Sequence, residues 1–81
     1  MTIDQLRQMH QARPFRPFDI HLADGRSLPV EHPEFLSQSA GGRTLAVAVP
    51  DTDAIEVVDL LLVTSLKQRP DGTPRRGRYG R

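Results

Sequence analysis

Phe18-Asp-Ile-His-Leu-Ala-Asp-Gly-Arg-Ser-Leu-Pro-Val30 predicts a tight β-hairpin, and the rest of the fold builds on it. Apolar residues alternate with polar ones on both sides of Ala23-Asp-Gly25, as in a half-buried strand pair. We expect a three-residue loop with Gly25 in the left-handed conformation, which only glycine adopts at low cost. The expected pairs are Phe18 with Val30, Ile20 with Leu28, and Leu22 with Arg26. The other face would carry Asp19, His21, Ser27 and Glu31. Burial of the apolar face fixes this register.

Residues 2–12 are expected to form a short amphipathic helix. Thr2 is a suitable N-cap, and Gln5, three residues later, completes a capping-box pattern. A narrow apolar stripe runs through Ile3, Leu6 and Met9. Because Pro14 disfavours helical geometry at the preceding residue, the helix should end near residue 13.

Three more strands are expected at residues 43–49, 54–59 and 63–68, which gives five in all. Residues 37–42 are interpreted as a polar loop or a bent strand tip, and residues 60–62 as a short link, such as one 3-10 turn. Five short strands with one apolar face leave unprotected edges when they lie flat. The sequence therefore favours a mostly β fold, in which an N-terminal helix precedes a five-stranded small barrel of the SH3/Sm-like kind.

The composition indicates one intracellular domain. The chain has 81 residues and no cysteine, which excludes disulfides and cysteine-ligated zinc and fits a reducing cytoplasm. The N-terminus lacks the basic start and apolar centre of a signal peptide, and no apolar run approaches the ~18 residues of a membrane span. We expect a barrel domain at residues 1–68 and a flexible Arg/Gly-rich tail at residues 69–81.

Charge is distributed unevenly along the chain. Residues 69–81 hold five arginines and one aspartate, a net charge of +4. Residues 1–68 hold six Lys/Arg and nine Asp/Glu, a net charge of −3. A mildly acidic body with a strongly basic tail suggests an anionic partner.

Two segments resemble the Sm-like family, and within it the bacterial Hfq proteins. Residues 20–28 are similar to the family's first hairpin, with its Asn-Gly or Asp-Gly turn. Residues 57–66 are similar to its last two strands, which one 3-10 turn joins. The resemblance implies a bent five-stranded barrel with an N-terminal helix, and a ring-shaped homo-oligomer. Where Hfq proteins carry a Tyr-Lys-His run in the RNA-binding pore, this chain has Val58-Asp-Leu60, so the resemblance does not extend to pore chemistry.

The basic tail is the candidate nucleic-acid site. Arginine pairs bidentately with phosphate, and a tyrosine can stack on a base. The candidate residues are Arg69, Arg75, Arg76, Arg78, Tyr79 and Arg81. The alternative is a solvated tail that improves solubility or contacts an acidic neighbour.

Ala46, Ala48 and Val58 are the candidate oligomer interface, because they are expected to lie off the core face of their strands. The alternative is a sheet face covered by the N-terminal helix. An open edge and a thin core both favour self-association, so we expect a homo-oligomer.

No motif indicates an enzyme, a metal or a cofactor. His10, His21 and His32 lack the spacing of a metal site, and Asp51 and Asp53 lack the glycine and glutamate of a calcium loop. The sequence therefore favours a non-enzymatic Sm-like binding and assembly protein with RNA or another polyanion on its tail. The alternative is a protein–protein interaction module, or an accessory subunit of a larger complex, with no nucleic-acid role.

Overall fold

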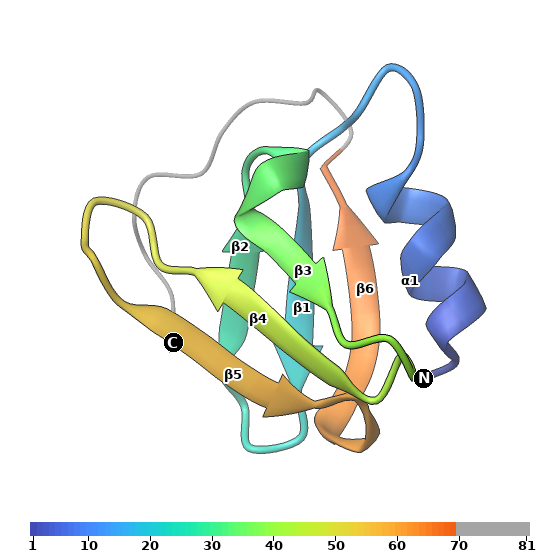
Figure 1. Ribbon diagram of the computed structural model, residues 1–81, viewed down its shortest axis with the longest axis vertical. Coiled ribbons are helices and arrows are strands. Elements are labelled where there is room, and N and C mark those ends of the chain that lie inside the picture. Colours follow the sequence, from blue (N-terminus) through green and yellow to red (C-terminus); the bar gives the residue numbers. More distant parts are fainter. Residues whose placement is uncertain (70–81) are drawn as a thin grey trace.

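The computed structural model describes residues 1–69, and residues 70–81 lie outside the described part. One helix, α1 (Ile3–His10), precedes six strands (Figure 1). The strands are β1 (Phe18–Leu22), β2 (Ser27–Val30), β3 (Leu36–Gln38), β4 (Thr44–Ala48), β5 (Ile55–Asp59) and β6 (Val63–Gln68). The 3-10 turn η1 (Pro33–Phe35) follows β2, and η2 (Leu60–Leu62) follows β5. Neither α1 nor these turns has the length and apolar character needed to cross a membrane.

The helix α1 begins at the expected capping box. The Thr2 side chain accepts a hydrogen bond from the Gln5 backbone at 3.4 Å, and the Gln5 side chain accepts one from the Thr2 backbone at 3.3 Å. These bonds satisfy two backbone donors that a helix start otherwise leaves open. Leu6 is fully buried, so this short helix is stabilised mainly by packing on the sheets.

The β1–β2 hairpin has the expected register. Phe18 pairs with Val30 and Ile20 with Leu28, while the Leu22 amide donates to the Arg26 carbonyl at 2.8 Å. Gly25 has a φ of 94°, the left-handed conformation that the short loop requires. The central prediction about this hairpin is therefore confirmed.

The strands form two three-stranded antiparallel sheets, β2-β1-β6 and β3-β4-β5, which lie one in front of the other in Figure 1. A mostly β fold with one helix is thus confirmed. Among the described strands, no backbone pairing joins the two sheets, so a closed barrel is not found. The turn η1 separates β2 from β3. It begins at Pro33, which has no backbone N–H to donate to a neighbouring strand.

The strand count differs from the expected five because β3 is a separate strand. Leu36 is 3% exposed and pairs with Val47, which draws residues 36–38 into the second sheet. A three-residue strand offers one inward apolar side chain, too few for an alternation to be visible in the sequence.

Both sheets and α1 contribute to one apolar core. Its buried members are Leu6, Phe18, Ile20, Leu22, Leu28, Val30, Leu36, Leu45, Val47, Val58 and Val63. Figure 1 shows α1 on the side of β6, away from β5. The β5 end of the molecule therefore lacks the cover that the helix gives elsewhere.

Candidate functional site

The outward side of β4 and β5 carries exposed aliphatic side chains. Ile55 is 65% exposed and Val57 is 62% exposed. In the sheet register, Ala48 pairs with Ile55 and Ala46 pairs with Val57, so the four side chains share one face. We call Ala46, Ala48, Ile55 and Val57 the β5 face.

Two of the three residues predicted to form the oligomer interface lie on the β5 face. Ala46 and Ala48 lie half-buried on the β5 face, as expected from their strand positions. Val58 does not lie there, because it pairs with Leu45 and is 4% exposed within the core. Successive side chains of a strand point to opposite faces, so an inward Val58 places Val57 outward.

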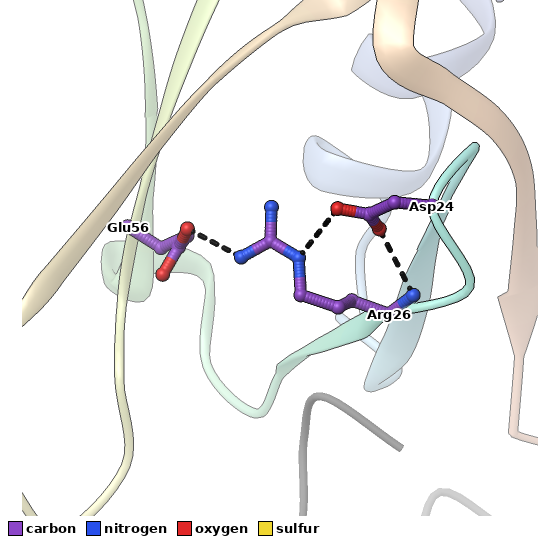
Figure 2. A network of polar contacts seen from close by, with 3 residues as sticks. All are labelled: Asp24, Arg26 and Glu56. Atoms are coloured by element: carbon purple, nitrogen blue, oxygen red, sulfur yellow. Dashed lines mark hydrogen bonds and ion pairs between the residues drawn. The ribbon is translucent and has the colours of Figure 1, made fainter.

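Ile55 and Val57 were not predicted as exposed, because the opposite side of β5, with Val58, was expected to face away from the core. Glu56 shares the inward side with Val58, where a carboxylate is unexpected. Figure 2 shows the reason: the Arg26 guanidinium reaches from the hairpin and donates to Glu56 at 2.7 Å. The sequence carries no local signal for this orientation, since the alternation of Ile55 and Val57 around Glu56 favours the opposite one.

Arg26 also binds Asp24, within its own loop. The Arg26 Nε donates to Asp24 at 2.9 Å, and the Arg26 backbone N–H donates to the same carboxylate at 3.1 Å (Figure 2). The backbone hydrogen bond is the main cause that lowers the pKa of Asp24, and the Glu56 hydrogen bond is the main cause that raises the pKa of Arg26. These contacts tie the hairpin of one sheet to β5 of the other.

Each three-stranded sheet of the described residues has two edge strands with one partner, which are β2 and β6 in one sheet and β3 and β5 in the other. Within residues 1–69, β5 pairs with β4 alone and β6 pairs with β1 alone. The outer backbone groups of such strands can accept another strand. On β5, this edge lies beside the exposed β5 face.

Arg69 belongs to the folded body rather than to the tail. Its guanidinium donates to Asp19 at 2.9 Å and to both Glu31 oxygens, at 2.9 and 3.3 Å. All three residues are buried, with exposed fractions of 1% for Asp19, 8% for Glu31 and 7% for Arg69. Burial by itself lowers the pKa of Arg69, but the hydrogen bonds to the two carboxylates outweigh it and raise that pKa.

This ion cluster corrects the placement of Arg69 in a flexible nucleic-acid segment. The outer face of the hairpin was expected to carry Asp19 and Glu31, and it does, but Arg69 covers them. The domain therefore extends by at least one residue beyond the expected boundary at residue 68. The other candidate nucleic-acid residues, Arg75, Arg76, Arg78, Tyr79 and Arg81, lie outside the described residues.

His10 takes part in a chain of hydrogen bonds that joins α1 to β3 and η1. Arg7 Nε donates to Gln38 Oε1 at 3.1 Å, Gln38 Nε2 lies 3.1 Å from His10 Nδ1, and His10 Nε2 lies 2.7 Å from the Pro33 carbonyl. Since the carbonyl can only accept, Nε2 carries a proton and Nδ1 accepts from Gln38. The chain borders an open groove of about 600 Å³, but its polar groups already bind one another.

The remaining histidines lie apart. His21 is half-buried on β1, while His32 is exposed and makes an edge contact with Phe35, with ring centroids 5.1 Å apart. Across residues 1–69, no group of three or more His, Cys, Asp or Glu side chains is arranged to hold a metal ion.

Comparison of the chain with protein-family models, with curated proteins and with solved structures found no match.

Proposed function

We propose that the chain is a non-enzymatic, self-associating protein of the SH3/Sm-like small-barrel kind, and that copies assemble through the edge of β5. The observation that carries the proposal is the exposure of Ile55 and Val57, at 65% and 62%, on a strand with one partner among the described residues. Exposed aliphatic side chains beside an open strand edge favour pairing with another chain.

The charges of the edge strands favour a head-to-tail contact over a symmetric one. β5 carries Asp59 and follows a turn with Asp51 and Asp53, and none of the three binds Arg26 as Glu56 does, so pairing β5 with β5 of a second copy would bring like charges together. β6 carries Lys67 and no acidic residue, and within the described part no strand pairs with its outer edge, although α1 lies on that side (Figure 1). Pairing β5 with β6 of the next copy is heterologous, and such contacts form a ring when the rotation closes.

The tail supports the second part of the proposal, which is RNA binding by Arg75, Arg76, Arg78, Arg81 and Tyr79. Arg69 is left out, because its guanidinium binds Asp19 and Glu31. Removal of residues 70–81 should abolish binding to single-stranded RNA, and binding by the full chain should weaken steeply as salt rises. Affinity that survives both changes would reject the tail as the RNA site.

Native mass measurement tests the assembly. We expect the full chain to elute as an oligomer with or without RNase, and Val57→Lys to elute as a monomer, because a charge on the β5 face opposes its burial. Gln11→Lys is the matched control, since it adds the same charge at the exposed residue that follows α1. A wild-type chain that remains monomeric at high concentration would reject assembly.

A different observation favours the alternative of a protein–protein interaction module. Leu61 of η2 is 79% exposed, and Leu62 is 48% exposed beside a notch of about 250 Å³ that Leu22, Ala23, Asp24 and Leu62 line. This apolar end of the molecule could dock on another protein. Under this alternative, Leu61→Lys abolishes capture of a partner, whereas Val57→Lys leaves the native mass unchanged.

A further inference from the structure

The β5 face lies within the most acidic part of the chain. Residues 50–60 carry no Lys or Arg, and their four acidic residues give a net charge of −4. These residues are Asp51, Asp53, Glu56 and Asp59. The β5 face is thus an exposed aliphatic surface with an acidic border.

Other carboxylates of the body are paired or isolated. Asp19 and Glu31 are buried against Arg69, while Asp24 and Glu56 bind Arg26. Within residues 1–69, neither Asp51 nor Asp53 forms an ion pair, and both are exposed in the turn that leads into Ile55. The negative charge available to a cation is therefore concentrated beside the β5 face.

The chain itself contains a segment of matching chemistry. Residues 70–81 carry four arginines and one aspartate, a net charge of +3. An arginine can lay its aliphatic stem on an apolar surface while its guanidinium reaches a carboxylate. Ile55 and Val57 offer that apolar surface, and Asp51 and Asp53 offer the carboxylates.

We propose that the β5 face and its acidic turn are a docking surface for residues 70–81 of the same chain. The twelve residues that follow Arg69 reach about 40 Å when extended, at roughly 3.3–3.6 Å per residue, whereas the longest dimension of the molecule is 29 Å. The segment is thus long enough to reach β5 within one copy. The docked segment would compete with a second copy for the β5 face and with RNA for its arginines, so the docking is expected in copies whose β5 face is not buried in an assembly.

A spin label tests the docking in the full-length protein. The chain has no cysteine, so Gly80→Cys provides a single attachment site for a nitroxide. We expect the label to broaden the amide signals of Asp53, Ile55 and Val57 selectively in low salt. Raising the salt from about 10 mM to about 1 M shortens the Debye length from about 30 Å to about 3 Å and should remove the broadening. When the labelled protein is diluted into an excess of unlabelled protein, the broadening should persist if the segment docks on its own copy and should be lost if it docks on another copy.

Charge variants make the test specific. Asp51→Asn combined with Asp53→Asn should remove most of the broadening, whereas Asp4→Asn combined with Glu34→Gln, which deletes two charges elsewhere, should leave it intact. Broadening that centres on another element, spreads evenly over the body, disappears on dilution into unlabelled protein or survives Asp51→Asn with Asp53→Asn would overturn the proposal. A monomeric native mass with the expected broadening would reject the assembly while supporting the docking.

Discussion

Replacement of Arg69 by methionine should strongly destabilise the protein. Methionine keeps much of the side-chain volume but removes the guanidinium that donates to Asp19 and to both carboxylate oxygens of Glu31, which are buried. Removal of one partner from a buried ion pair costs about 3–5 kcal/mol, because the remaining charge stays buried without compensation. A chain of this length has a total stability of about 4–12 kcal/mol, so the loss is a large fraction of the whole.

Urea unfolding, followed by circular dichroism, measures this loss. With a slope of about 1.5 kcal/mol per molar urea, the midpoint should fall by roughly 2–3 M. Arg13→Met is the matched control, because Arg13 is exposed, and its midpoint should change little.

Arg69→Met alone could prevent folding altogether, so a triple variant keeps the reasoning testable. Asp19→Asn with Glu31→Gln and Arg69→Met contains no buried charge at this site and should be more stable than Arg69→Met by several kcal/mol. An Arg69→Met protein within about 1 kcal/mol of wild type would refute the assignment of Arg69 to the body.

Two further predictions follow from the turns. Gly42→Ala should destabilise the protein by about 2–4 kcal/mol, because Gly42 has a φ of 72° and an added Cβ would lie 2.9 Å from Ile3 Cγ1. Gly41→Ala, which meets no atom within 4 Å, is the control, and equal melting temperatures of the two variants would contradict the packing of α1 on this loop. Arg26→Met should raise the pKa of Asp24 without restoring its ordinary value, because the backbone N–H of residue 26 still donates. At a pH above the pKa that Asp24 has in the unfolded chain, the ionised carboxylate of Asp24 stabilises the fold. As acid is added, this stabilisation should be lost at a higher pH in Arg26→Met than in the wild type. A carboxyl carbon titration by NMR that is identical in both proteins would contradict the contact.

The parts of the fold that follow from local rules could be predicted from the sequence. The Thr2–Gln5 capping box and the Gly25 loop are each specified within a few residues, and the alternation around Ile20 fixes the hairpin register. Each of these features depends only on contacts between residues that are close together in the sequence.

The parts that depend on distant partners could not be predicted. Glu56 points inward because Arg26, thirty residues earlier, binds it. Arg69 is buried because Asp19, fifty residues earlier, accepts from it. The pattern of apolar and charged residues along one sequence does not indicate which charged side chains form ion pairs. The predicted inward face of β5 and the predicted placement of Arg69 in the tail were therefore wrong.

Hydrogen–deuterium exchange of β5 at several protein concentrations tests most directly whether this edge joins one copy to the next. We expect the amides of residues 55–59 to become protected as the concentration and the native mass rise together, while the amides of the β1–β2 loop exchange at a constant rate. Exchange in β5 that is independent of concentration, in a protein whose mass increases, would contradict the account and place the contact elsewhere.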